Sequence, residues 1–174
     1  MKQIIKKALI SVSDKTNLSK ILKTLNKYKV EIISSGGTFK SIKKLGYPCT
    51  EVSVYTGFKE MLDGRVKTLH PKIHAGILYD RSNKKHSKEM SRQKFSSIDL
   101  IIVNFYPFQK IVTNSKSNKD IIENIDIGGP TMVRSAAKNF KNVLIITNKN
   151  DYPDLINEIE KNKGKTSLSF RELM

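Results

Sequence analysis

Short apolar runs alternate along this chain with stretches in which apolar residues recur every three or four positions. Continuous apolar runs are typical of strands buried on both faces of a sheet, and the wider spacing is typical of helices with one apolar stripe. The clearest stripe is Leu18, Ile21, Leu22 and Leu25. The predicted strands are 8–12, 30–33, 49–52, 75–78, 100–103 and 143–146. The predicted helices are 18–25, 38–45, 84–95, a helix ending near 125, 130–140 and 152–159.

The order of these elements favours a single α/β domain. Strands that alternate with helices build a parallel sheet, so we expect a doubly wound, mainly parallel sheet with helices on both faces. Pro130 suits the first turn of the helix that it opens, because its missing N–H would have no helical partner there. The apolar residues of that helix predict a buried face made by Val133, Ala136, Ala137 and Phe140.

Composition excludes several classes of protein. The formal charge of +16 is compatible with a nucleic-acid partner, but only five of the 32 basic residues are arginine. The lysines are scattered and few aromatic residues lie among them, so we expect no nucleic-acid partner. No apolar run approaches the roughly 20 residues that span a bilayer, and the first residues lack a secretory signal, so we expect no membrane association. Cys49, the single cysteine, excludes an internal disulfide, favours the cytoplasm, and is predicted to be a small buried strand residue.

Residues 64–71, with the sequence GRVKTLHP, carry the most specific chemistry. In an extended segment alternate side chains point to the same side, so we expect Arg65 and Lys67 to act together. A planar Arg fork, a mobile Lys charge and the hydroxyl of Thr68 suit a phosphate group. A solvated basic loop is the alternative interpretation of these residues alone.

Two predicted strands end in loops that also suit an anion. Residues 11–16, SVSDKT, precede a helix whose first N–H groups attract negative charge. Helix capping explains Asp14 but not Lys15, whose charge opposes the helix dipole. Residues 34–38, SSGGT, place two glycines before a second helix, where consecutive N–H groups form either an anion nest or a plain turn. The simplest interpretation is one phosphomonoester held by both loops and by residues 65–68, at the carboxyl ends of the strands.

A third polar set follows the strand at 100–103. Asp126 lies just before a glycine pair and a helix, where it is either a catalytic carboxylate or a helix cap. Arg134 and Lys138 lie on the helix face opposite the apolar one, which is also the expected solvent face. The full set is Asn104, Tyr106, Asp126, Gly128, Gly129, Arg134 and Lys138.

Other ligand classes find little support. His70 and His74 are four residues apart, but Pro71 disfavours one continuous helix through both, and no third residue has zinc spacing. We therefore expect no metal site. The chain has neither a Walker A sequence nor Gly-x-Gly-x-x-Gly, which argues against a nucleoside triphosphate or a dinucleotide bound in those modes.

Six segments, which together extend over nearly the whole chain, resemble one family in order: SVSDKT, SSGGT, GRVKTLHPKIHAGIL, NFYPF, DIGGPTMVRSAAKN and TSLSFREL. The family is the inosine-monophosphate (IMP) cyclohydrolase domain, the N-terminal half of bifunctional purine biosynthesis proteins. The other half is the transformylase that acts on aminoimidazole carboxamide ribotide (AICAR). The resemblance implies a methylglyoxal-synthase-like fold and cyclisation of 5-formamidoimidazole-4-carboxamide ribotide, or formylated AICAR, to IMP with loss of water. It implies no cofactor and no metal.

The resemblance also implies roles for individual residues. A carboxylate takes the carboxamide proton as the nitrogen attacks the formyl carbon, while donors stabilise and then protonate the formyl oxygen so that water leaves. The implied catalytic residues are Lys67, Tyr106, Asp126 and Lys138. The implied substrate-binding residues are Ser11, Ser13, Lys15, Ser35, Gly37, Thr38, Arg65, Thr68, Asn104 and Gly128.

The same resemblance implies a homodimer, and a transformylase domain if the parent protein is longer. It divides the chain into a cyclohydrolase domain at 1–161 and, at 162–174, the start of a linker toward a C-terminal domain absent from this chain. Lys138 lies about 12 Å along the helix from Pro130, so it acts in the site, behind it, or in a neighbouring subunit.

Two alternative functions would require only the predicted phosphate-binding segments at 11–16, 34–38 and 65–68. One is a methylglyoxal-synthase-like regulatory domain that binds a phosphorylated effector without catalysis. The other is methylglyoxal synthase itself, which acts on a small sugar phosphate. The joint presence of Asp126, Tyr106 and Lys138 favours cyclisation over both.

Overall fold

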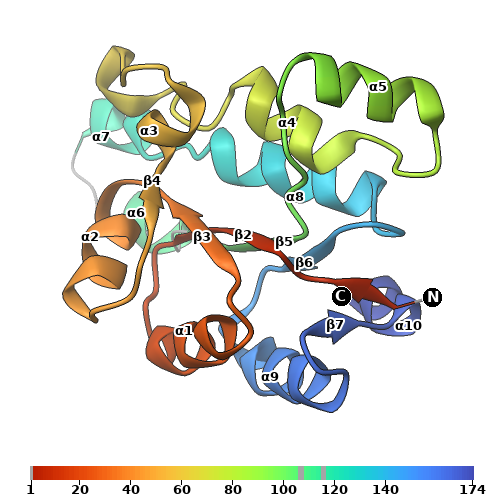
Figure 1. Cartoon of the computed structure of the whole chain (residues 1–174). Coiled ribbons are helices and arrows are strands. Elements are labelled where there is room, and N and C mark those ends of the chain that lie inside the picture. Colours follow the sequence, from red (N-terminus) through yellow and green to blue (C-terminus); the bar gives the residue numbers. More distant parts are fainter. Residues whose placement is uncertain (1, 106–107, 115–116) are drawn as a thin grey trace.

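A parallel sheet of five strands forms the centre of the protein (Figure 1). The computed structural model describes residues 2–105, 108–114 and 117–174. The strands of the sheet are β2 (Lys7–Val12), β3 (Glu31–Ser34), β4 (Thr50–Glu51), β5 (Leu100–Asn104) and β6 (Leu144–Ile146). They lie in the order β4-β3-β2-β5-β6, and every pair is parallel. This arrangement, with helices on both faces, confirms the predicted α/β fold.

Helices connect the strands and cover the sheet. They are α1 (Leu18–Lys27), α2 (Gly36–Lys44), α3 (Val52–Thr56), α4 (Pro71–Leu78), α5 (Lys84–Arg92), α6 (Phe108–Asn114), α7 (Asn118–Glu123), α8 (Gly128–Lys138), α9 (Tyr152–Lys161) and α10 (Leu168–Leu173), with single 3₁₀ turns η1 (Leu62–Gly64) and η2 (Lys149–Asp151). Among the described residues, no helix is both long and apolar enough to cross a membrane.

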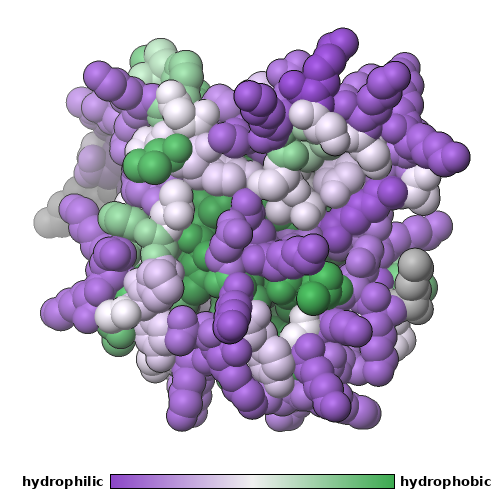
Figure 2. Space-filling view, viewed as in Figure 1, coloured by the Kyte–Doolittle hydropathy of each residue, from purple (hydrophilic) through white to green (hydrophobic). Residues whose placement is uncertain are grey.

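Side chains on the two faces of the sheet form two apolar cores. Ile10 and Ile102 pack with α1 and α9 on one face, and Leu9 and Ile101 pack with α4 and α8 on the other. Figure 1 shows these helix pairs on opposite sides of the sheet. In the space-filling view, hydrophobic residues gather in the middle of this face of the molecule and hydrophilic residues surround them (Figure 2). Strands buried on both faces must be continuously apolar, which is why β2 and β5 are predicted well.

The direction in which strands are added reverses between β2 and β5. From β2 the chain moves outward to β3 and β4, and it returns to add β5 and β6 on the other side. In doubly wound sheets, ligands bind at the carboxyl ends of the strands near such a reversal. The loops that follow β2, β3 and β5 therefore frame the region where a site is expected.

Residues 75–78 are helical, which corrects the strand predicted there. They form the end of α4, which begins at Pro71. The Nδ1 atom of His70 caps this helix by accepting a hydrogen bond of 3.1 Å from the N–H of Lys72. Ile73 and Ile77, four residues apart, are buried on one face of the helix. A run of four apolar residues fits a strand and a buried helix equally well, so the cap and the proline decide between them.

Helix α8 is rotated relative to its predicted buried face. It begins at Gly128, two residues before Pro130, and buries Met132, Ser135 and Ala136, whereas Ala137 is exposed. The glycine pair therefore belongs to the first turn of the helix and not to the loop before it. In addition, the helix predicted to end near 125 is described as two shorter helices, α6 and α7.

Cys49 lies just outside the strand to which it was assigned. The predicted strand at 49–52 contains only the two residues of β4, and Cys49 precedes them, half-buried against the core formed with α1 and α9. Burial raises the pKa of its thiol to about 11, so the protonated form is favoured. The side chain contributes to packing, and its environment does not activate a nucleophile.

Residues 162–174 are part of the fold, which corrects the linker predicted to start there. Strand β7 (Lys165–Thr166) pairs antiparallel with β1 (Gln3–Ile4). The Arg171 side chain is buried, and it donates hydrogen bonds to the carbonyl oxygens of Thr166 at 2.7 Å and of Phe140 and Lys141 at 3.0 Å. The buried guanidinium is bonded to backbone carbonyls, and such contacts leave no pattern in the sequence that would have indicated a folded segment.

Candidate functional site

A cleft of about 480 Å³ opens beside the carboxyl ends of β2 and β3. Its walls come from the end of β2, the start of α2, residues 63–68, the end of α7 and the first turn of α8. Segments far apart in sequence therefore converge on it. Seven predicted site residues line the cleft: Ser11, Ser35, Arg65, Lys67, Thr68, Asp126 and Gly128.

Two lysine side chains approach the glycine pair that opens α2. A Cβ atom built on Gly36 would lie 3.7 Å from the Lys67 Nζ, and one on Gly37 would lie 3.9 Å from the Lys15 Nζ. Gly36 has a φ of +54°, a left-handed conformation that a glycine adopts without cost. The N-cap residue Ser35 makes no side-chain cap hydrogen bond to the helix. Two ammonium groups and the positive end of α2 thus meet at one place, an arrangement that attracts a phosphate.

Three predicted ligands, Ser13, Thr38 and Asn104, make hydrogen bonds that support the frame of the site. The Thr38 hydroxyl is buried and accepts a hydrogen bond from the N–H of Val12 at 3.0 Å while donating one to the Val12 carbonyl at 2.9 Å. The Asn104 Oδ1 accepts from the N–H groups of Ser13 at 2.7 Å and Asp14 at 3.0 Å, and its Nδ2 donates to the Asp14 carbonyl at 2.8 Å. The Ser13 hydroxyl lies 3.0 Å from the same Oδ1. These side chains fix the loop that carries Lys15.

The segment around Arg65 and Lys67 is a series of turns, which corrects the extended conformation predicted for it. Leu62, Asp63 and Gly64 have φ values of 51°, 52° and 88°, and Lys67 N–H donates to the Gly64 carbonyl at 3.1 Å. Left-handed non-glycine residues are strained and cluster at functional sites. Both cations still line the cleft, but each reaches a different carboxylate.

Arg65 and Lys67 are both ion-paired. The Arg65 guanidinium forms an ion pair with the Glu123 carboxylate through two of its nitrogens, and its Nε lies 3.3 Å from Oε1. The Lys67 Nζ lies 2.8 Å from the Glu60 Oε1. The hydrogen bond from Arg65 lowers the pKa of the Glu123 carboxyl, and it raises the pKa of Arg65. Neither glutamate was predicted from the sequence, and the only available signal was that each lies a few residues from a predicted motif.

Asp126 caps helix α8 and also faces the cleft. Its Oδ1 accepts a hydrogen bond of 2.8 Å from the Gly129 N–H. A Cβ on Gly129 would come within 2.4 Å of the Asp126 Oδ2, and one on Gly128 within 2.3 Å of the Thr68 Oγ1. The two glycines are therefore required by close approach, because any side chain would separate α8 from both groups. The carboxylate therefore acts as a helix cap, and its place in the cleft lining is also compatible with a role as a catalytic base.

Two predicted catalytic residues are not brought into the cleft by the described chain. Tyr106 lies outside the described residues. Lys138 is the exposed last residue of α8, about 15 Å along the helix axis from Gly128, and the cleft lining does not include it. A direct role for Lys138 in this copy's cleft therefore has no support from the geometry.

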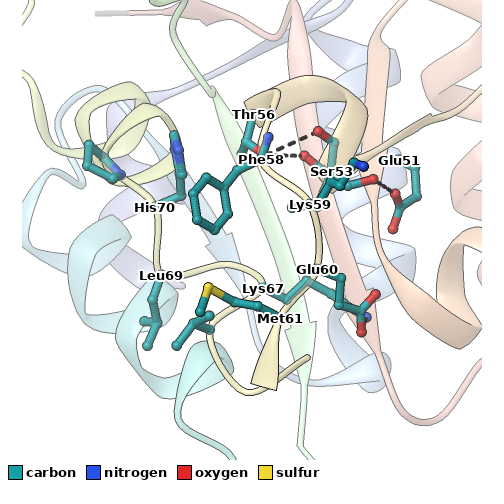
Figure 3. Close-up of a pocket in the computed structure, with 13 residues that line it drawn as sticks. Glu51, Ser53, Thr56, Phe58, Lys59, Glu60, Met61, Lys67, Leu69 and His70 are labelled. Atoms are coloured by element: carbon teal, nitrogen blue, oxygen red, sulfur yellow. Dashed lines mark hydrogen bonds and ion pairs between the residues drawn. The ribbon is translucent and has the colours of Figure 1, made fainter. Parts of the chain in front are cut away.

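A second pocket, of about 340 Å³, adjoins the cleft and shares Lys67 with it. Figure 3 shows Phe58, Met61 and Leu69 around this pocket, with Glu60 beside Lys67 at its edge. The Phe58 and His70 rings lie 5.9 Å apart. Within the described residues, no group of three or more His, Cys, Asp or Glu side chains is placed to hold a metal ion.

Comparison with known families identifies the domain. The model of the MGS-like domain matches residues 17–131, which is well over half of the chain. This chain belongs to the MGS-like domain family. A second model, described as the AICARFT/IMPCHase bienzyme, matches residues 136–174 of this MGS-like domain protein, including the segment that folds as β7 and α10.

Individual relatives agree with these matches. The bifunctional purine biosynthesis protein PurH of Clostridium acetobutylicum is 53% identical over 158 residues, which are 91% of this chain and 32% of that protein. PurH of Neisseria meningitidis serogroup C is 54% identical over 168 residues, 96% of this chain and again 32% of the relative. The crystal structure of ForH matches with a TM-score of 0.85 and 27% identity, covering 97% of this chain and 88% of that one. The chain spans about a third of the length of the PurH proteins it matches.

Proposed function

We propose that this MGS-like domain cyclises formylated AICAR to IMP with loss of water, as the last step of purine biosynthesis. The observation that carries the proposal is that Lys15 and Lys67 both approach the start of α2, beside a cleft that Lys67 and Asp126 line. The similarity to proteins named for purine biosynthesis, and to a family named for IMP cyclohydrolase, supports the same substrate.

The phosphate of the substrate is proposed to bind at the start of α2. Lys15 and Lys67 supply positive charge. The N–H groups of the first helical turn supply hydrogen-bond donors, because the Ser35 side chain does not cap them. Arg65, which also lines the cleft, adds a planar fork. This places the imidazole ring toward Thr68 and the first turn of α8.

The ring closure then needs one base and one acid. The carboxamide nitrogen attacks the formyl carbon, Asp126 accepts the proton released by that nitrogen, and the formyl oxygen gathers negative charge. Lys67, which lines the cleft, is proposed to stabilise this oxygen and to protonate it to a hydroxyl. The proton held by Asp126 then converts the hydroxyl to water, which leaves as the former formamide nitrogen gives its own proton to Lys67 and the C=N bond forms. Tyr106 is proposed as a further donor.

Lys138 is proposed to act across the interface of a homodimer. Because it lies at the far end of α8, we place its ammonium group in the cleft of a second copy of the chain. A transformylase domain is the second proposed partner, from the names of the relatives. Sedimentation that gives only a 19.8 kDa monomer at micromolar concentration would contradict the dimer.

A second function is favoured by one observation. Asp126 is a helix cap, and Lys138 is remote, which together suit a regulatory domain that binds a phosphorylated effector without turnover. Ultraviolet detection of IMP formed from formylated AICAR separates the two functions. Turnover by the purified chain supports cyclisation, whereas IMP binding without turnover, in the dimeric chain, would contradict it and support the regulatory function.

A further inference from the structure

Both cations of the cleft wall are already occupied by carboxylates of the chain itself. Arg65 holds Glu123 through two nitrogens, and Lys67 holds Glu60 at 2.8 Å. The two glutamates come from different elements, Glu60 from the loop after α3 and Glu123 from the last residue of α7. Their side chains are about half exposed, at 45% and 49%, so each can leave its partner without opening the core.

The carboxylates lie where an incoming anion must bind. Glu123 is itself part of the cleft lining. The Glu60 Oε1 lies 2.6 Å from the place of a Cβ on Gly64, and it contacts the same Lys67 Nζ that lies beside Gly36. A phosphate at the start of α2 and the Glu60 carboxylate therefore compete for one ammonium group. Arg65 presents one planar fork, which fits either a carboxylate or a phosphate.

We propose that Glu123 and Glu60 are internal competitors for the phosphate-binding cations and are released from them when a phosphomonoester binds. This inference rests on the proposed phosphate site. It predicts that the chain binds phosphate more weakly than its cations alone would allow, because only the fraction with released cations is competent. Weakened ground-state binding also favours release of a phosphorylated product.

The first test is calorimetric titration of IMP into the purified chain and into Glu123→Gln. The amide keeps the shape of the side chain but cannot hold Arg65 as an ion pair. Exposed ion pairs are weak, so we expect affinity to increase only about two- to fivefold. Asp120→Asn is the matched control, because it removes one negative charge from the same helix at a residue outside the cleft lining. The increase in Glu123→Gln must exceed the increase in this control.

The second test repeats the substitution without Arg65. Arg65→Ala is expected to weaken IMP binding roughly 10- to 150-fold, the loss of a charged hydrogen bond. In the Arg65→Ala background, the extra increase from Glu123→Gln should disappear, since there is no cation left to release. Glu60→Gln is expected to behave toward Lys67→Ala in the same way.

The outcomes separate the two proposals. Unchanged affinity in Arg65→Ala would contradict the phosphate site itself. Weaker binding in Arg65→Ala, together with unchanged or weaker binding in Glu123→Gln, would leave the phosphate site standing and overturn the competition, because Glu123 would then position Arg65 for the ligand. Thermal unfolding of each variant shows that the compared proteins are folded.

Discussion

Two regions meet at the cleft and use their polar side chains in opposite ways. Thr38 in the first turn of α2 and Asn104 at the end of β5 are bonded to backbone groups at and just after the end of β2. In residues 60–68, Arg65 and Lys67 are paired with half-exposed carboxylates. Buried hydrogen bonds are costly to leave unmade, and exposed ion pairs exchange readily with other anions. One region is a fixed frame, and the other is free to exchange its partners for a ligand.

Asp126, just before α8, combines a bond to a backbone group with a place in the cleft lining, and its substitution is expected to have the largest effect. Asp126→Asn should keep the cap on Gly129, because Asn is an equally good N-cap, and should lose the base. Turnover should fall by a factor on the order of 100 to 10,000, with the thermal midpoint nearly unchanged. Both are measured on one preparation, by IMP formation and by thermal unfolding.

The control for this prediction is Asp126→Ala, which removes the cap as well. It should lower stability by about 1 kcal/mol in addition to the loss of rate. A folded Asp126→Asn variant that cyclises near the wild-type rate would make Asp126 a helix cap only, with a structural role like that of the fixed frame.

Substitution of Lys15 tests whether the fixed frame also contributes a side chain that binds the phosphate. Its ammonium group lies beside Gly37 at the start of α2, on a loop that Asn104 fixes. Lys15→Ala should weaken IMP binding roughly 10- to 150-fold with little change in stability. Lys20→Ala, exposed on the adjacent α1, is the matched control for the loss of one positive charge. Equal affinities in the two variants would remove Lys15 from the site.

Asn104 tests the rigidity of the frame itself. Asn104→Ala leaves the N–H groups of Ser13 and Asp14 without the side-chain acceptor, so unfolding free energy should fall by about 1–3 kcal/mol. Urea unfolding against Asn157→Ala, an exposed position on α9, isolates this loss. Glu123→Gln should show a much smaller change. Similar losses in Asn104→Ala and Glu123→Gln would contradict the division into two regions.

The frame is largely predictable from the sequence, and the exchangeable region is not. Strands such as β5 are apolar without interruption because both their faces are buried, and parallel strands place the loops after them at one edge of the sheet. That reasoning is sufficient to bring Ser11 and Ser35 to one cleft.

Tertiary contacts decide what the sequence does not reveal. The pair between Arg65 and Glu123 spans 58 positions and follows no periodic pattern. The left-handed turn at 62–64 replaces the extended segment that alternate cations suggested, because φ values of this kind are not encoded by hydrophobic pattern. The side chain of Asn104 was predicted to touch substrate, yet its hydrogen-bonding groups are used by Ser13 and Asp14.

The smallest expected effect concerns His74, which ties the segment after the exchangeable region to α8. Its Nδ1 lies 3.1 Å from the Ser135 Oγ, and burial lowers the pKa of its imidazole below the ordinary value near 6.5. The folded state therefore prefers the neutral ring. Above about pH 6.5 both states are neutral and the contribution to stability is complete; below it the unfolded chain takes up the proton first, so stability falls as pH falls.

His74→Gln isolates this contribution, because the amide retains a polar partner for Ser135 and does not titrate. Urea unfolding between pH 8 and pH 5.5 should show stability falling less steeply in His74→Gln than in the wild type below about pH 6.5. The difference in slope cannot exceed about 1.4 kcal/mol per pH unit, the limit for a single proton. The two proteins differ only at position 74, so the comparison isolates the contribution of that side chain. Identical slopes would mean that burial of His74 does not couple the link between α4 and α8 to pH.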